Sequence, residues 1–175
     1  MTNQVLQTER LILRRFTAED AEEYFPLVSD PEILRYAGGL PVKTIDETRQ
    51  MLLKLPIRDY ELHGYGRMAC IEKSSGRLIG FSGIKYLPGM QETDVGYRFL
   101  KDCWGKGYAT ESARPLMREG IREHGLKRII GLAESANAAS THVLEKLGLV
   151  FERTIMLDDH PNELELYGID TRNFT

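Results

Sequence analysis

The segment from Trp104 to Thr110, with the sequence Trp-Gly-Lys-Gly-Tyr-Ala-Thr, has the features of a loop that binds an anion. It follows a predicted strand and opens a predicted helix. Because Gly105 and Gly107 have no Cβ, their backbone amides allow an anion to approach closely. The free N–H groups of the first helical turn add the positive end of the helix dipole. This pattern predicts a pyrophosphate cradle, while a glycine pair taken alone also fits a simple loop before a helix.

The same loop lacks two better-known phosphate motifs. A Walker loop needs glycine where Leu100 stands, and it needs Ser or Thr after the lysine, where Gly107 stands. The dinucleotide fingerprint needs a third glycine, which is absent from the required place. Kinase and NAD-dependent chemistry are therefore disfavoured.

A second segment, Asn137-Ala-Ala-Ser140, opens another predicted helix directly after a predicted strand. Asn137 is a suitable N-cap, and Ser140 stands at the third helical position, where it can share the capping. The functional interpretation is that Asn137 hydrogen-bonds an amide-bearing ligand while the Ser140 hydroxyl gives a proton to a leaving group. Both interpretations can hold together.

Histidine and cysteine spacing does not indicate a metal site. The residues concerned are His63, His124, His142, His160, Cys70 and Cys103. No histidine pairs with another His, Cys or carboxylate at metal spacing, and the cysteines form no CxxC. We therefore expect no metal, and we expect two reduced thiols in a cytoplasmic protein.

The pattern of predicted strands and helices shows where the two motif segments lie along the fold. The predicted strands cover 10–16, 66–72, 78–84, 93–100, 128–133, 151–156 and 164–170, and the predicted helices begin near 18, 46, 108 and 138. Three strands in succession over 66–100 predict an antiparallel meander. Pro56 is expected to close the second helix, Pro115 to kink the third, and Gly96 to mark a bulge or a close packing contact.

Length and composition bound the class of protein. The chain has 175 residues, of which 42% are hydrophobic and 28% charged, so we expect one globular domain over residues 1–175. Its 23 Lys and Arg against 26 Asp and Glu give a net charge of -3, which supplies no overall basic field for nucleic acid. Residues 1–15 do not read as a secretory signal, and no apolar run is long enough to span a bilayer.

Together, the two segments and the strands around them resemble the GNAT superfamily of acetyl-CoA-dependent N-acetyltransferases. The superfamily's pyrophosphate motif is Arg or Gln, two variable residues, Gly, one variable residue, then Gly or Ala, and it corresponds here to 104–109. Trp104 departs from the usual first residue. That departure, together with Thr8-Glu-Arg-Leu-Ile-Leu-Arg14, is similar to the branch of ribosomal-protein N-terminal alanine acetyltransferases. The resemblance spans about residues 8–170.

The resemblance implies an α+β fold, with a mixed, mostly antiparallel twisted sheet that is flanked by helices. This sheet would be splayed between the strands over 93–100 and 128–133, and the pantetheine arm of acetyl-CoA would lie in the opening. A backbone amide near Tyr97 or Phe99 would polarise the thioester carbonyl. The residues expected to bind acetyl-CoA are Tyr97, Phe99, Leu100, Trp104, Gly105, Lys106, Gly107, Tyr108, Ala109, Thr110 and Asn137.

The implied reaction is acetyl transfer to a primary amine by direct attack in a ternary complex. The amine acceptor is either a protein N-terminus or a small molecule. Leu144 stands where the family often has a tyrosine as general acid, which leaves Ser140 as the expected acid. Asp94 is the expected proton acceptor or amine anchor, because the family often has a carboxylate at this position, and Glu92 and Glu134 are weaker competitors.

Two other functions remain open at this point. One is a non-catalytic acyl-CoA sensor or protein-interaction module that keeps the cofactor loop without turnover. The other, a nucleotide-phosphate enzyme that uses the glycine loop, is disfavoured by the missing motifs. The sequence does not predict the oligomeric state.

Overall fold

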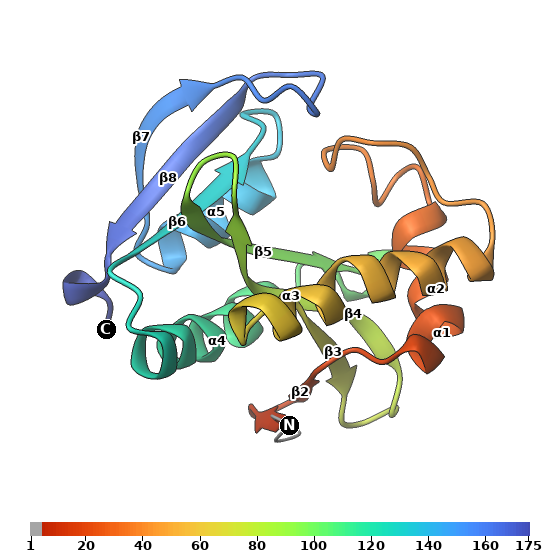
Figure 1. Ribbon diagram of the computed structural model, residues 1–175. Helices are drawn as coiled ribbons and strands as arrows, with labels where there is room; N and C mark the ends of the chain where they lie inside the picture. Colours follow the sequence, from red (N-terminus) through yellow and green to blue (C-terminus); the bar gives the residue numbers. More distant parts are fainter. Residues whose placement is uncertain (1–4) are drawn as a thin grey trace.

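A computed structural model describes residues 5–175. Its centre is an eight-stranded sheet in the order β1-β2-β3-β4-β5-β6-β8-β7 (Figure 1). The strands are β1 (Val5–Gln7), β2 (Leu11–Arg14), β3 (Met68–Glu72), β4 (Leu78–Leu87), β5 (Glu92–Phe99), β6 (Arg128–Ala133), β7 (Val150–Ile155) and β8 (Leu164–Asp170). Neighbouring strands are antiparallel except β5 and β6, which are parallel. The predicted α+β class with a mostly antiparallel sheet is confirmed, and residues 1–4 of the predicted domain lie outside the described residues.

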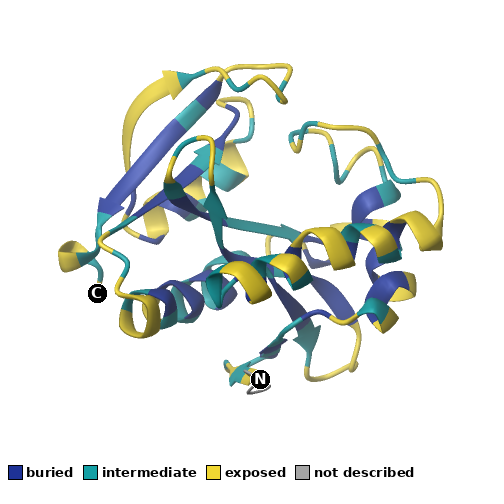
Figure 2. Cartoon of the chain, in the orientation of Figure 1, coloured by how far each residue is buried: buried dark blue, intermediate teal, exposed yellow. Residues whose placement is uncertain are grey.

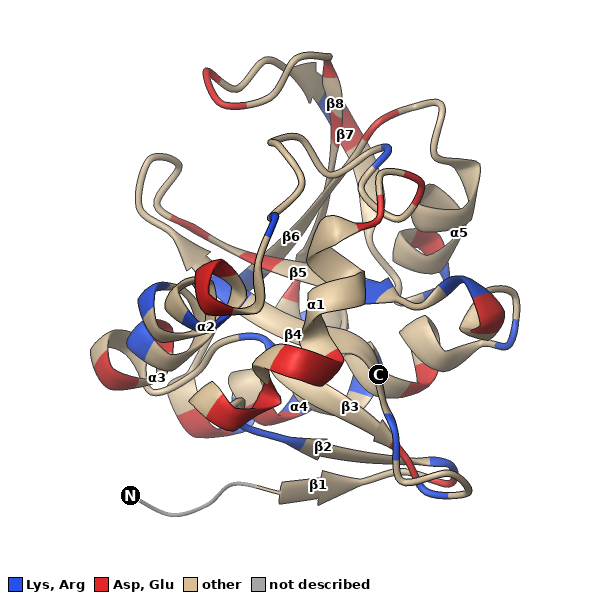
Figure 3. Ribbon diagram, turned by 90° about the vertical axis from the view of Figure 1, so that its right-hand side faces the viewer, with Lys and Arg blue, Asp and Glu red and all other residues tan. Residues whose placement is uncertain are grey.

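Helices flank this sheet on both faces. They are α1 (Ala21–Ser29), α2 (Ile45–Lys54), α3 (Pro56–His63), α4 (Tyr108–His124) and α5 (Ala138–Lys146), with short 3-10 turns over Ala18–Asp20, Lys101–Cys103 and Thr171–Asn173. No helix between residues 5 and 175 combines the length and the apolar composition needed to cross a bilayer. Acidic and basic side chains are interspersed in the view of Figure 3.

Strand register assigns side chains to the two faces of the sheet. Residues directly opposite one another in paired strands share a face. Ala69, Phe81 and Arg98 are partners across β3, β4 and β5, and the first two pack with residues of α1 and α2. Ile84 and Val95 are paired three positions further along, so their side chains are on the other side, and they pack with residues of α4 and α5. We call these two sides the α1 face and the α4 face.

The sheet opens between β5 and β6. These strands are paired only at Asp94 and Ile130, whereas β4 and β5 are paired continuously from Gly80–Phe99 to Leu87–Glu92. Beyond the single β5–β6 pairing, backbone groups of β5 that point toward β6 have no strand partner. This is the predicted opening in the sheet, and it connects the α1 face with the α4 face.

Two elements were not predicted, and two local expectations need correction. The strand β1 and the helix α3 were not predicted, and Pro56 begins α3 instead of closing the preceding helix. Proline is well suited to the first helical position, where its missing N–H would be unpaired anyway. Gly96 forms no bulge, since the β4–β5 register has no shift, and its alternative reading is confirmed because the Arg67 guanidinium fills the space of a side chain there.

Buried residues concentrate where the sheet meets its helices (Figure 2). The helix α4 runs through Pro115 to His124, so the proline does not end it. At the far edge, β7 is mostly exposed, and Val150 and Phe151 keep 68% and 52% of their surface in solvent. The site therefore has to be built from the central strands and the helices behind them.

Candidate active site

The glycine loop is open to solvent at Gly105. Gly105 and Gly107 adopt left-handed backbone conformations with φ of 71° and 82°, which few other residues adopt without strain. A Cβ added at Gly105 would meet no atom within 4 Å. Space for an anion is therefore available beside the loop.

The first turn of α4 supplies amide donors to that space. Gly107 is the N-cap residue, and because it has no side chain, no side-chain oxygen caps the helix. The amide of Glu111 already donates to the Gly107 carbonyl at 3.0 Å, so the unpaired amides are those before it. The amides of Tyr108, Ala109 and Thr110 are free to bind a diphosphate.

Trp104 fixes the start of the loop. Its indole Nε1 donates a hydrogen bond to the carbonyl of Phe99 at 2.8 Å, at the end of β5. The rest of the side chain is 48% exposed. The unusual first residue of the motif therefore has a structural role, which is to attach the loop to the strand beside the opening.

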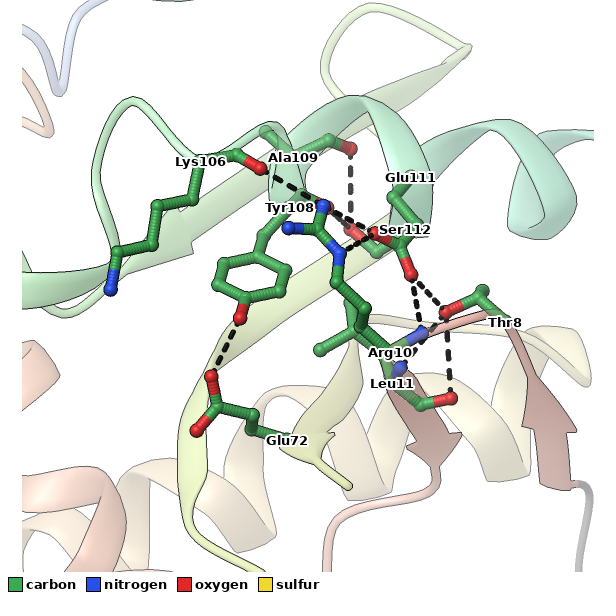
Figure 4. A network of polar contacts seen from close by, with 9 residues as sticks. All are labelled: Thr8, Arg10, Leu11, Glu72, Lys106, Tyr108, Ala109, Glu111 and Ser112. Atoms are coloured by element: carbon green, nitrogen blue, oxygen red, sulfur yellow. Dashed lines mark hydrogen bonds and ion pairs between the residues drawn. The ribbon is translucent and has the colours of Figure 1, made fainter. Parts of the chain in front are cut away.

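An ion pair fixes the other end of the loop to the N-terminal segment (Figure 4). Arg10 donates to Glu111 through Nε at 2.7 Å and through its backbone N–H at 2.9 Å, and Thr8 Oγ1 donates to the same carboxylate at 2.6 Å. The Arg10 Nη2 also donates to the carbonyl of Lys106 at 2.9 Å, and the guanidinium lies 4.3 Å from the centre of the Tyr108 ring. These contacts fix the conformation of the loop before any ligand arrives.

The charge state of Glu111 follows from these contacts. Burial alone would raise the pKa of this carboxyl, but the donors from Thr8 and Arg10 outweigh it and hold the pKa below its ordinary value. Glu111 therefore stays ionised beside the amino end of α4. Because its charge is directed at Arg10, it does not occupy the space in front of the loop.

Two amides of β5 point into the opening. The amide of Leu100 donates to the Ile79 carbonyl at 2.9 Å, toward β4, so it is not free for a ligand. Successive N–H groups of a strand point in opposite directions, which directs the amides of Phe99 and Tyr97 toward β6. The amides of Tyr97 and Phe99, which are expected to contact acetyl-CoA, thus face the opening, whereas the amide of Leu100 is already used within the sheet.

Asn137 and Ser140 lie across the opening from β5. Asn137 Oδ1 accepts a hydrogen bond from the Ser140 amide at 3.2 Å, so the predicted N-cap is present. Tyr97 Oη donates to the carbonyl of Ser140 at 2.8 Å and lies 3.2 Å from its hydroxyl. Since Tyr97 uses its proton on the carbonyl, the Ser140 hydroxyl is the donor in the second contact. The Ser140 hydroxyl therefore sits at the opening on the α4 face.

Burial raises the pKa of Tyr97 strongly, and the hydrogen bond with Ser140 only partly opposes this. Tyr97 thus keeps its proton at neutral pH. The side chain of Leu144, in contrast, is almost fully buried in the core against Gly131, which agrees with its inability to act as an acid.

Asp94 lies on the α1 face of the same opening, but its carboxylate already has a partner. Arg67 forms an ion pair with Asp94 Oδ2 and donates to the Asp94 carbonyl at 3.0 Å. Burial raises the pKa of Asp94, and the Arg67 guanidinium opposes that rise. Asp94 is only 8% exposed, and these contacts favour a structural role that ties the residue before β3 to β5.

A family model described as an acetyltransferase (GNAT) domain matches residues 10–150, most of the chain. The chain belongs to the GNAT acetyltransferase family. It is similar to an uncharacterised N-acetyltransferase, p20, of Bacillus licheniformis, with 32% identity over 161 residues that cover 90% of this chain and 87% of the relative.

Solved GNAT structures share the fold. A GNAT-family acetyltransferase from Bacillus anthracis superposes with a TM-score of 0.81 at 25% identity, covering 97% of this chain and all of that one. RimL, a ribosomal L7/L12 alpha-N-protein acetyltransferase in complex with coenzyme A, superposes with a TM-score of 0.78 at 18% identity, covering 95% of this chain and 98% of that one. This GNAT protein is therefore an acetyl-CoA-dependent acetyltransferase.

The residues of this GNAT site fit coenzyme A. The ligand carries a diphosphate and an arm that contains two amides. The open loop at Gly105 and the free amides of α4 suit the diphosphate, and the unpaired amides of Tyr97 and Phe99 suit the arm. Within residues 5–175 no three metal-ligating side chains gather into a candidate metal site.

The sequence did not indicate the residues that hold this GNAT site together. Arg67 is distant in sequence from Asp94, and Glu111 is distant from Arg10, so neither pair has a local spacing signal. Charged side chains in predicted strands and helices ordinarily face solvent. The sequence offered one indication that Glu111 belongs to the site, which is its position in the helix that directly follows the glycine loop.

Proposed function

We propose that this enzyme transfers the acetyl group of acetyl-CoA to a primary amine by direct attack while both ligands are bound. The observation that carries this proposal is the position of the glycine loop at the end of β5, beside the β5–β6 opening. That opening runs from the α4 face to the α1 face. Acetyl-CoA and the amine can thus meet from opposite sides, and holding two reactants in place contributes much of the rate enhancement.

The cosubstrate is bound mostly by backbone groups. The residues of this site are Trp104, Gly105, Lys106, Gly107, Tyr108, Ala109 and Thr110 for the diphosphate, with Tyr97, Phe99 and Asn137 for the pantetheine arm. Asn137 uses its Oδ1 for the helix cap, which leaves its Nδ2 to donate to an amide carbonyl of the arm. Acetyl-CoA supplies the activated acyl group, and the chain supplies its orientation.

One strand amide would stabilise the charge that develops on the thioester oxygen. The amide of Tyr97 or Phe99 faces the opening and has no strand partner in β6. A fixed donor of this kind contributes on the order of 10²–10³-fold to the rate of acyl transfer. The structure favours these amides over that of Leu100, which is bonded to β4.

Ser140 is the proposed general acid. Its hydroxyl lies at the opening, and Tyr97, which stays protonated, lies 3.2 Å behind it. As the carbon–sulfur bond breaks, Ser140 gives its proton to the departing sulfur, and a proton lost by the acceptor nitrogen replaces it. General acid catalysis of this kind contributes roughly 10²–10⁴-fold.

The acceptor is proposed to be a primary amine of a protein N-terminus or of a small molecule. RimL, which shares the fold at 18% identity, is a ribosomal L7/L12 alpha-N-protein acetyltransferase, so protein N-termini are the first class to test. The α1 face offers the amine an approach that does not cross the cosubstrate's path.

The test is release of CoA from acetyl-CoA, measured with peptides bearing free N-termini and with small primary amines. We expect amine-dependent release and an N-acetylated product detected by mass spectrometry. Tight binding of acetyl-CoA without release for any amine would instead support the acyl-CoA sensor.

A further inference from the structure

We propose that Glu134 is the carboxylate that receives the acceptor amine and takes its proton, and that His160 and Asn162 are positioning residues for it. This proposal rests on the proposed amine acetylation, and it names the proton acceptor for that reaction on the α1 face.

Three carboxylates near the opening compete for this role, and two are paired with arginine. Asp94 is paired with Arg67, and Glu92 accepts from Arg128 Nε at 2.9 Å. A carboxylate held by a guanidinium has its charge already compensated, so it gains little from binding a second cation such as the ammonium of the acceptor. Glu134 has no Lys or Arg partner among residues 5–175.

Glu134 lies on the same face of the sheet as Asp94. Asp94 and Ile130 are paired across β5 and β6, so their side chains share the α1 face. Alternation along β6 brings Leu132 to that face, and Glu134, directly after the strand, contacts His160 and Asn162, of which His160 reaches the loop that follows α1. Ser140 lies across the opening, on the α4 face. An amine that enters from the α1 face thus meets Glu134, with the proposed acid on the other side of the reacting carbon.

Surrounding groups hold the Glu134 carboxylate in one orientation. Its side chain is only 10% exposed, and Oε1 accepts from Asn162 Nδ2 at 3.2 Å and lies 3.5 Å from His160 Nε2. Oε2 has no hydrogen-bond partner among the described residues. A nearly buried carboxylate without a cation is costly, and a cationic ligand would remove that cost.

His160 lies in the loop between β7 and β8, and it contacts both Glu134 and the loop that follows α1. Its Nε2 lies 3.5 Å from the carbonyl of Tyr36, its Nδ1 accepts a hydrogen bond from the Asn162 backbone N–H at 3.4 Å, and its ring contacts Gly38. Because both neighbours of Nε2 are acceptors, Nε2 carries a proton directed at Glu134. Figure 1 shows these loops, one after α1 and one between β7 and β8, facing each other across the top of the molecule. His160 is thus already bonded on both nitrogens and orients the carboxylate instead of acting as the base itself.

The proton balance is complete with groups already named. The ammonium form of the acceptor binds Glu134 and gives it one proton. The neutral nitrogen then uses its lone pair to form the C–N bond, and the C–S bond breaks with its electron pair on sulfur. Ser140 protonates that sulfur. The nitrogen loses a second proton once the C–N bond has formed, and this proton replaces the one that Ser140 gave away. Glu134 returns its proton to solvent, so each turnover releases one proton.

A pH experiment must distinguish the effect of Glu134 from the effects of other titratable groups in the two loops. Those within three residues of Tyr36 or His160 along the chain are Arg35, Tyr36, Asp158, Asp159 and Glu163. All except Tyr36 are exposed, and Tyr36 faces His160 only through its carbonyl. Glu163→Gln is therefore a matched control, because it removes a carboxylate from the same loop without touching the site.

The test measures kcat/KM for CoA release between pH 6 and 9, with alaninamide, phenethylamine and spermidine as probes, together with acetyl-CoA affinity by calorimetry. For Glu134→Gln we expect a loss of about 100-fold at neutral pH that shrinks as the free amine becomes abundant, with unchanged acetyl-CoA affinity. His160→Gln should shift the pH profile with a smaller loss, and Glu163→Gln should match the wild type.

If the wild type releases CoA and Glu134→Gln equals it at every pH, or loses the same factor at every pH, the assignment of Glu134 is overturned while amine acetylation stands. If the wild type binds acetyl-CoA but releases no CoA with any probe or peptide, the proposed function itself falls, and Glu134 with it.

Discussion

The Tyr97 hydroxyl donates to the Ser140 carbonyl at 2.8 Å and lies 3.2 Å from the Ser140 hydroxyl, so one side chain joins β5 to the helix that follows β6. The two elements border the opening in the sheet, where strand pairing has ended. These two contacts hold the Ser140 hydroxyl in place beside the opening.

Ser140→Ala should lower kcat by about 10²–10⁴-fold while acetyl-CoA affinity and melting temperature change little. Stability should hold because the Asn137 cap bonds the Ser140 amide, which alanine retains. Steady-state kinetics and thermal melting check this. A variant with wild-type kcat would remove Ser140 from the chemistry and leave it as a helix-cap residue.

Gly105→Ala should weaken acetyl-CoA binding, and Gly76→Ala is its control. Both glycines have φ of 71°, and an added Cβ would meet no atom within 4 Å at either, so each substitution should destabilise the fold by about 1–2 kcal/mol through backbone strain. Only Gly105 faces the proposed diphosphate. Equal acetyl-CoA affinity in the two variants, measured by calorimetry, would argue against the loop as the binding site.

Glu111→Gln should destabilise the protein by about 1–3 kcal/mol at neutral pH, because it removes the ionised acceptor for Thr8 and Arg10. The folded-state pKa of Glu111 lies below its unfolded value, so its contribution is present above the ordinary Glu pKa of about 4.3 and is lost as the pH falls through the folded-state pKa. The unfolding free energies of wild type and variant should therefore converge in acid. Denaturant titrations at several pH values test this, and a difference that stays constant down to acid pH would contradict it.

Asp94→Asn should act mainly on stability. It leaves the Arg67 guanidinium buried without its carboxylate, and breaking a buried pair in this way costs about 3–5 kcal/mol. The pH profile of the remaining activity should keep its shape. Should the alkaline rise in rate flatten while the melting temperature holds, Asp94 would be the proton acceptor, as the sequence alone suggested, and Glu134 would not.

Local patterns predicted much of the fold correctly. The meander and the two helices that begin near the functional motifs were predicted because apolar periodicity, glycine and N-cap residues mark them in short windows. The helix α3 was missed because Pro56 reads equally well as the end of one helix or the start of the next. No periodicity accompanies β1, which has three residues.

The site was predictable only where backbone groups define it. The glycine loop and the Asn137 cap are encoded in consecutive residues, so their sequence is their signal. Whether the amide of Leu100 is free depends on its partner in β4, and whether Asp94 is available depends on Arg67. Such pairings arise only when distant strands are brought together, and no spacing along the chain reveals them.

A crystal structure of the enzyme with acetyl-CoA tests the central claim most directly. The diphosphate oxygens should accept hydrogen bonds from amides between Gly105 and Thr110, and the pantetheine arm should lie between β5 and β6 beside Tyr97 and Phe99. Density for the diphosphate away from α4, with the β5–β6 opening left empty, would contradict both the cosubstrate site and the reaction derived from it.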